Sequence, residues 1–189
     1  MEYILDTPKP RIATSKLLLW LAIASMIMMF AGLTSGYIVR QAEGNWLTII
    51  IPQAFYFSTA FILLSSFTMK LALMAVKNNN LSGVKTYLII TLGLGLAFVF
   101  SQFLGYNNLV SQGVFFTGGT ASASFFYAIT GLHLAHLAGG ILSLMFVTTK
   151  AIMEKYNGDN FIGMQICSTF WHFLDGLWIY LFLFLSLAG

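Results

Sequence analysis

Two pairs of ionisable side chains lie inside apolar stretches in the second half of this sequence. His133 and His136 are three residues apart in one stretch, and His172 and Asp175 are three residues apart in the next. On a helix, residues three apart share a face. Because an ionisable side chain at mid-membrane costs about 2.5 to 3.5 kcal/mol, it normally faces other helices, a partner or a polar path. We therefore expect these four residues to form one interhelical polar network.

Imidazole and carboxyl groups in this arrangement are compatible with three kinds of chemistry. Two histidines on facing helices could ligate a haem, and three histidines allow at most one such site. An imidazole and a carboxyl group could relay protons, because imidazole titrates near neutral pH. The third alternative is polar packing, in which hydrogen bonds of about 0.6 kcal/mol each fix the register of two helices. We favour polar packing, and we expect no catalytic residue and no metal site in this chain.

The composition is that of an integral membrane protein. Of the 189 residues, 58% are hydrophobic and only 8% are charged, far from the balance of a soluble domain. The net charge of +3 does not indicate a nucleic-acid partner, because no basic surface interleaved with aromatic residues is apparent. The single Cys167 excludes an internal disulfide and any site with several cysteine ligands.

Five apolar segments are long enough to cross about 30 Å of hydrocarbon. They predict an all-α, polytopic membrane protein, with residues 1–189 forming a single transmembrane domain and a bundle of five helices. The predicted spans cover residues 17–39, 47–76, 87–106, 124–149 and 164–187. Pro52 is expected in the first turn of the second span. The uncharged connection 107–123 is expected at the membrane interface.

The basic residues predict the orientation in the membrane. Eight of the nine Lys and Arg residues precede the first span, surround the loop after the second or follow the fourth, and only Arg40 falls on the other side. Basic residues are retained on the cytoplasmic side. We therefore expect a cytoplasmic N-terminus and, with five spans, a C-terminus outside.

Two motifs that contain the four polar residues resemble signatures of a known family, subunit III of the haem-copper oxidases, of which cytochrome c oxidase is the best-known member. The segment 130–140 is similar to the family's T-G-x-H-x-x-H-x-x-x-G signature, and the segment 170–178 is similar to its W-H-F-x-D-x-x-W signature. Weaker similarities follow in the same order at 16–25, 64–68 and 102–106. The chain resembles the short, five-helix bacterial form, which lacks the first two of the seven spans of longer members.

This resemblance implies a non-catalytic subunit III of a respiratory terminal oxidase in the bacterial cytoplasmic (inner) membrane. Such a subunit supports assembly, stability, lipid binding and proton uptake of the catalytic subunit, while haem and copper reside in partner subunits. The implied partners are oxidase subunits I and II, with a small subunit IV or a larger respiratory supercomplex as further candidates. Bound phospholipid is also expected, and the candidate lipid contacts are Trp171, His172 and Trp178.

The chain departs from the family pattern at three positions. Met26, Gly105 and Gln165 stand where the family usually has glutamate, so a role that depends on a buried carboxylate in the first span cannot be carried over. Related alternatives are an accessory subunit of a nitric oxide reductase or of a quinol oxidase. From other classes, a small membrane transporter would more often show an internal repeat, which is not apparent here, and a membrane cytochrome would bind haem itself.

Overall fold

The computed structural model describes residues 10–42, 44, 46, 49, 51–117, 120–154, 156 and 161–188, with side chains from residue 14 onward. These residues form five α-helices and no strand: α1 (Pro10–Ala42), α2 (Gln53–Lys77), α3 (Leu81–Ser111), α4 (Ala121–Ile152) and α5 (Ile162–Ala188). Each helix is long and apolar enough to cross a membrane. The predicted all-α architecture with five membrane-spanning helices is therefore confirmed.

Two predicted details of the helix ends were wrong. Pro52 does not lie in the first turn of the second helix, because its extended backbone (φ −60°, ψ 148°) makes it the residue before the helix, which begins at Gln53. The connection 107–123 is shorter than expected, because the polar residues that end α3 remain helical as far as Ser111. Ser111 Oγ donates a hydrogen bond to the Asn108 carbonyl at 2.7 Å, which satisfies a carbonyl at the helix end.

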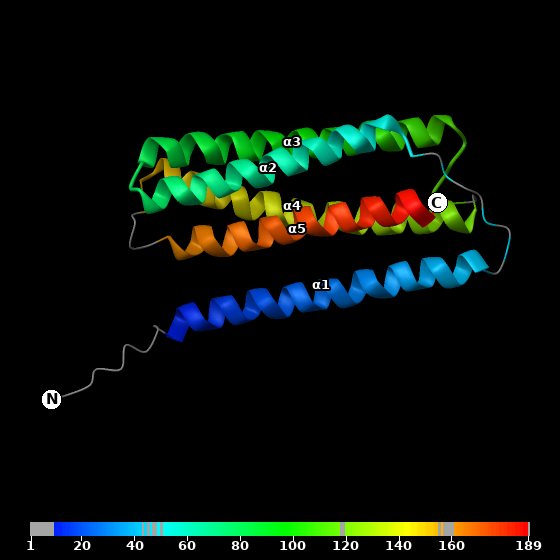
Figure 1. Cartoon of the computed structure of the whole chain (residues 1–189), viewed down its shortest axis with the longest axis horizontal. Coiled ribbons are helices and arrows are strands. Elements are labelled where there is room, and N and C mark those ends of the chain that lie inside the picture. Colours follow the sequence, from blue (N-terminus) through cyan, green and yellow to red (C-terminus); the bar gives the residue numbers. More distant parts are fainter. Residues whose placement is uncertain are drawn as a thin grey trace.

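Helix α1 lies apart from the group formed by the other four helices (Figure 1). Its polar contacts with α5 come from its C-terminal half, where Thr34 and Tyr180 share a hydrogen bond of 3.2 Å and Gln41 Nε2 donates to the Ala188 carbonyl at 2.8 Å. In contrast, every residue from 14 to 22 is exposed except the half-buried Leu19. Helix α1 is therefore packed against the other helices from Ile23 onward, and the turns before it are exposed.

Helices α3 and α4 each approach α5 closely at a glycine, where the missing side chain leaves space for a large side chain of α5. A Cβ atom at Gly95 would lie 2.8 Å from the Trp171 ring, and one at Gly140 would lie 2.8 Å from a Leu174 methyl group. Their neighbours Gly93 and Gly139 have nothing within 4 Å of that position. Only one glycine of each pair is therefore needed for packing, consistent with small residues allowing close contact between membrane helices.

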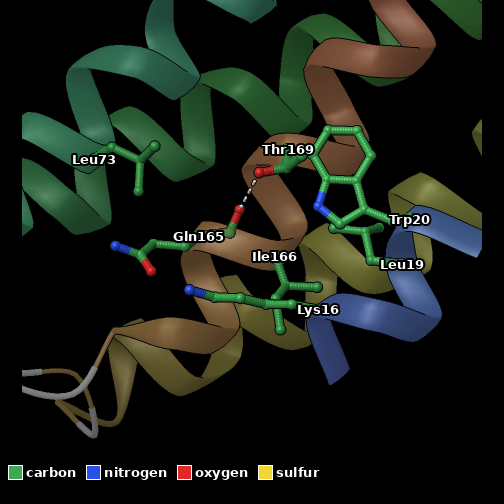
Figure 2. A pocket seen from close by; sticks show the side chains of 7 residues that line it. All are labelled: Lys16, Leu19, Trp20, Leu73, Gln165, Ile166 and Thr169. Carbon is green, nitrogen blue, oxygen red and sulfur yellow. Dashed lines mark hydrogen bonds between the residues drawn. The ribbon is translucent and has the colours of Figure 1, made fainter. Parts of the chain in front are cut away.

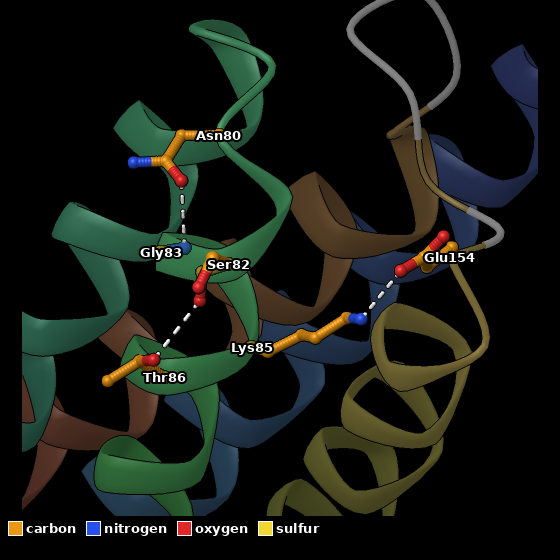
Figure 3. Close-up of polar contacts among 6 residues, drawn as sticks. All are labelled: Asn80, Ser82, Gly83, Lys85, Thr86 and Glu154. Atoms are coloured by element: carbon orange, nitrogen blue, oxygen red, sulfur yellow. Dashed lines mark hydrogen bonds and ion pairs between the residues drawn. The ribbon is translucent and has the colours of Figure 1, made fainter.

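The alternating direction of the helices brings one set of helix ends together (Figure 1). The lysines of the described segments belong to this end, which we call the basic end: Lys16, Lys70, Lys77, Lys85 and Lys150. Lys85 of α3 donates a hydrogen bond of 2.8 Å to Glu154, just beyond α4 (Figure 3). This bond and the nearby positive charge hold the pKa of Glu154 below its usual value.

Candidate functional site

The carboxyl group of Asp175 is buried in the middle of α5. Its side chain is 2% exposed, and neither oxygen has a hydrogen-bond partner of good geometry among the described residues. Ser66 of α2 lies beside it. A buried carboxyl group without an ionic partner is costly in its charged form. Asp175 therefore faces the interior of the helix bundle, as a polar residue in a membrane helix is expected to do.

His172 lies one turn before Asp175 on the same helix and contacts the same serine. Its Nδ1 is 2.7 Å from the Ser66 hydroxyl oxygen. The ring is half-buried, so this cluster extends from the surface between α2 and α5 toward the interior. His172 and Asp175 thus lie on the same face of α5 and beside the same serine, Ser66, which was not among the predicted residues. A direct pairing of the two side chains stays a prediction.

His133 is fully buried, but its environment is aromatic. Its ring lies between Phe98 of α3, at a centroid distance of 6.1 Å, and Trp178 of α5, at 5.1 Å. Neither ring nitrogen has a hydrogen-bond partner in the described part of the chain. His133 therefore contacts α5 through the second tryptophan of the W-H-F-x-D-x-x-W segment, not through Asp175.

His136 faces a different helix. Its Nδ1 is 2.7 Å from the Leu132 carbonyl of its own helix, and its ring lies 5.9 Å from that of Phe30 on α1. Across residues 10–188, outside the gaps given above, no hydrogen bond joins His133, His136, His172 and Asp175 directly. The single four-residue network stays a prediction.

Hydroxyl groups along α2 form hydrogen bonds with polar side chains of α5. We call the α2 residues Ser58, Thr59, Ser65 and Ser66 the hydroxyl ladder. Trp171 Nε1 donates to Ser65 at 3.1 Å, and Trp178 Nε1 donates to Thr59 at 3.0 Å. The tryptophans are seven residues apart on α5, and their acceptors Ser65 and Thr59 are six residues apart on α2. Both separations are about two helical turns, so these contacts fix the antiparallel register of α2 and α5.

The same ladder continues to α3. Gln102 Nε2 donates a 2.8 Å hydrogen bond to Ser58, which lies seven residues before Ser65. The sequence contained a signal for this pattern, namely the Ser and Thr residues spaced by seven in the second apolar span. Hydrophobicity alone does not reveal it, because hydroxyl groups cost little in a membrane helix when they bond to their own backbone, as Ser58 and Ser65 also do.

Trp171 and Trp178, which we expected to contact lipid, are 0% and 1% exposed. Within this fold the other helices cover both indole rings, and their contact with lipid stays a prediction. Of the three candidate lipid contacts, only the half-buried His172 has surface open to the outside.

The three positions at which we expected a departure from the family pattern, Met26, Gly105 and Gln165, have different environments. Met26 is buried in the core at 7% exposure. At Gly105, a Cβ atom would lie 2.5 Å from the Phe55 ring, so that ring occupies the space of a side chain. Gln165 lies in a groove at the basic end (Figure 2). Two of these positions are thus filled by apolar packing, and the third carries a neutral polar group.

No group of three or more His, Cys, Asp or Glu side chains that could hold a metal ion occurs among the residues that the structure describes. The candidate site is therefore a set of interhelical contacts made by the two motif segments.

Comparison with known proteins gives one family and several bacterial relatives. The family model for cytochrome c oxidase subunit III matches residues 45–189. A protein named "Probable cytochrome c oxidase subunit 3" from Mycobacterium tuberculosis (strain ATCC 25618 / H37Rv) is 31% identical over 179 residues, covering 92% of this chain and 87% of the relative. "Cytochrome c oxidase subunit 3" from Bacillus sp. (strain PS3) is 29% identical, with 90% and 84% covered. "Probable quinol oxidase subunit 3" from Staphylococcus saprophyticus is 28% identical, with 93% and 89% covered.

The match to the family model contains α2 to α5 and leaves α1 outside. The pairwise alignment to the mycobacterial protein covers 92% of the chain and therefore extends into α1. Both comparisons thus cover the four helices that also carry the hydroxyl ladder and the buried motif residues.

Proposed function

The chain belongs to the cytochrome c oxidase subunit III family and is a subunit III of a haem-copper oxidase, and from this premise we propose that it is a non-catalytic subunit. In this role it supports assembly, stability, lipid binding and proton uptake of the catalytic subunit. Members of this family do not themselves carry metal centres. Oxygen reduction then takes place on haem and copper held by the partners.

The observation that carries this proposal is the use of the W-H-F-x-D-x-x-W segment in packing. Trp171, His172 and Trp178 all bond to hydroxyl groups of α2. Because the polar atoms of the segment are occupied by helix–helix contacts, they support a role in holding the subunit's shape.

Subunit III of an oxidase has other oxidase subunits as partners. We propose subunits I and II as the direct partners in this complex, with a small subunit IV or a respiratory supercomplex as further members. The relatives include subunits named for cytochrome c oxidase and for quinol oxidase, so both electron donors are compatible with the proposal.

The chain is a multi-pass membrane protein. We propose the bacterial cytoplasmic membrane as its location, with the basic end on the cytoplasmic side. This orientation rests on the lysines at one set of helix ends and on Arg40 at the other.

Affinity purification of the tagged chain from its native host in mild detergent tests the proposal. The expected preparation contains two larger oxidase subunits in fixed ratio with this chain, together with a haem spectrum. A colourless preparation that contains the chain alone would contradict the proposal and favour a transporter. Haem that remains bound to the separated chain would favour a cytochrome.

A further inference from the structure

The imidazole of His136 is half-buried and lies about midway along α4, which runs from Ala121 to Ile152. Its Nδ1 is 2.7 Å from the Leu132 carbonyl oxygen. Because a carbonyl oxygen only accepts hydrogen bonds, Nδ1 carries a proton and donates it. In the neutral ring the other nitrogen, Nε2, then has a lone pair and no proton. Nε2 of His136 is therefore a hydrogen-bond acceptor.

This acceptor has no donor among the residues that the structure describes. The buried polar atoms that lack a partner there include both ring nitrogens of His133 but neither ring nitrogen of His136, so Nε2 of His136 reaches the surface of the bundle. The hydrocarbon of a bilayer contains no hydrogen-bond donor and no water. Because an ionisable side chain at this depth normally has a polar partner, the donor is expected from another protein chain.

Small residues surround His136 on the surface of α4. Ala135 and Gly139 are exposed, and a Cβ atom at Gly139 would have nothing within 4 Å. The next residue, Gly140, differs because its space is filled by Leu174 of α5. Small residues on the surface of a membrane helix let a second helix approach closely. A helix packed here can therefore bring a short donor side chain to Nε2.

Helix α1 continues this surface on the other side of the imidazole. The Phe30 ring of α1 lies against the imidazole, with ring centroids 5.9 Å apart. A Cβ atom at Gly36 would lie 3.5 Å from Phe125 of α4, so this side of α1 faces α4. Gly32, one turn earlier on the same side, has nothing within 4 Å. Ser25, seven residues before Gly32, is exposed and has no hydrogen bond within the described part of the chain.

We propose that this surface, which we call the α1–α4 face and which consists of Ser25, Gly32, Ala135, His136 and Gly139, packs against a transmembrane helix of the catalytic oxidase subunit. A hydroxyl, amide or indole group of that helix donates a hydrogen bond to Nε2 of His136. The inference rests on the proposed function, because a subunit III has other oxidase subunits as partners. Helix α1 has room for such a partner, since only 22% of its most apolar window is buried, the smallest share among the five helices.

The first test is retention of this chain in the complex purified from its native host, measured as the ratio of this chain to the larger subunits over a series of detergents. Gly139→Leu places a bulky side chain on the α1–α4 face and should lower retention about tenfold. Gly93→Leu is the matched control, because Gly93 is also an exposed glycine with nothing within 4 Å but belongs to α3. It should leave retention unchanged.

The acceptor is tested by two changes at one position. His136→Leu removes the acceptor and should lower retention about threefold, the average effect of an interhelical hydrogen bond in a membrane. His136→Gln keeps an acceptor oxygen on a side chain of similar reach and should restore most of this loss. Equal retention of the two variants would overturn the assignment of Nε2 as an acceptor.

A photo-crosslinking amino acid in place of Leu132 identifies the molecule that covers the face. Leu132 is 36% exposed and lies one turn before His136 on the same side of α4. The expected product joins this chain to the catalytic subunit. A product that joins two copies of this chain, or the lack of any protein product, would overturn the proposal.

Equal retention of Gly139→Leu and Gly93→Leu would also overturn it. Failure of the proposed function has a different appearance, because the unmodified chain would then be purified without larger subunits. If only the α1–α4 face is wrongly assigned, the unmodified complex stays intact and the variants are retained as well as the unmodified chain.

Discussion

Helices α2 to α5 and helix α1 have similar composition but are held in different ways. In the most apolar window of α1, 22% of the residues are buried, against 39% in each of α3, α4 and α5. In the four-helix part, large side chains pack against glycines, and hydroxyl groups accept hydrogen bonds from indole N–H groups. In the N-terminal half of helix α1, the residues described from Lys16 onward make no contact of either kind. Apolar composition places a helix in the membrane, whereas small and hydroxyl-bearing residues decide what it packs against.

The largest effect is expected from filling a glycine position in the four-helix part. Gly95→Ala places a methyl group 2.8 Å from the Trp171 ring, and overpacking of this kind costs about 1 to 3 kcal/mol. The measurement is the free energy of unfolding in a detergent titration. Gly93→Ala, where nothing lies within 4 Å, is the control, and equal losses in both variants would contradict the packing role of Gly95.

Replacing Asp175 by Leu is expected to weaken retention of the chain in the purified complex about fivefold while initial turnover of intact complexes stays unchanged. Leucine removes the polar group that lies beside Ser66, and one polar contact of this kind is worth about 1 kcal/mol. Under the proposed role the chain contributes no redox chemistry, so turnover should not change. Quantified subunit ratios and oxygen consumption measure the two effects, with Asp175→Asn as control. Full retention together with immediate loss of oxygen reduction would instead indicate a direct proton role.

Ser65→Ala should destabilise the four-helix part by roughly 0.6 to 1.7 kcal/mol, the range for interhelical hydrogen bonds in membranes. The Trp171 indole then loses its acceptor. Unfolding free energies of Ser65→Ala, Trp171→Phe and the double variant give the coupling of the pair. A coupling free energy of zero would show that the hydrogen bond between Trp171 and Ser65 does not stabilise the four-helix part.

A smaller and more local effect is expected for Gln41→Leu. This change removes the 2.8 Å hydrogen bond to the Ala188 carbonyl and should cost about 0.6 kcal/mol. Hydrogen exchange should rise in α1 and stay constant in α2 to α5. Faster exchange spread evenly over all five helices would contradict the separate attachment of α1.

The smallest effect concerns the surface ion pair of Lys85 and Glu154. Lys85 lowers the pKa of Glu154 in the folded protein, so the pair contributes stability above the unfolded pKa of about 4.3, and this contribution is lost as pH falls through the folded value. Thermal unfolding between about pH 6 and pH 3 measures the effect, which should be slight because Glu154 is exposed and Lys85 is only half-buried. In Lys85→Gln this part of the pH dependence should vanish.

The fold could be predicted from the sequence because five apolar segments, each long enough to span a membrane, leave few alternatives. The helix ends were less predictable: Pro52 fits either side of a helix start, and the residues after Tyr106 are polar enough to be taken for a loop although they continue α3. The length of an apolar segment indicates that a membrane span exists, whereas local hydrogen bonding determines the residue at which the helix ends.

The candidate site could be predicted only in part. Spacing by three correctly indicates that His172 and Asp175 share a helix face, and both lie next to Ser66. The same rule does not say which neighbour each face meets, so it does not place His133 between two aromatic rings or His136 against α1. Those contacts depend on how helices are arranged around one another, which a single helix does not encode.

The most direct test of the account is to separate this chain from the purified oxidase complex and to record the reduced-minus-oxidised haem spectrum of both fractions with their initial rates of oxygen consumption. The account predicts that all haem and most of the initial rate stay with the larger subunits and that this chain is colourless. Haem in the separated chain, or immediate loss of oxygen reduction from a depleted complex that retains its haem, would contradict a non-catalytic role.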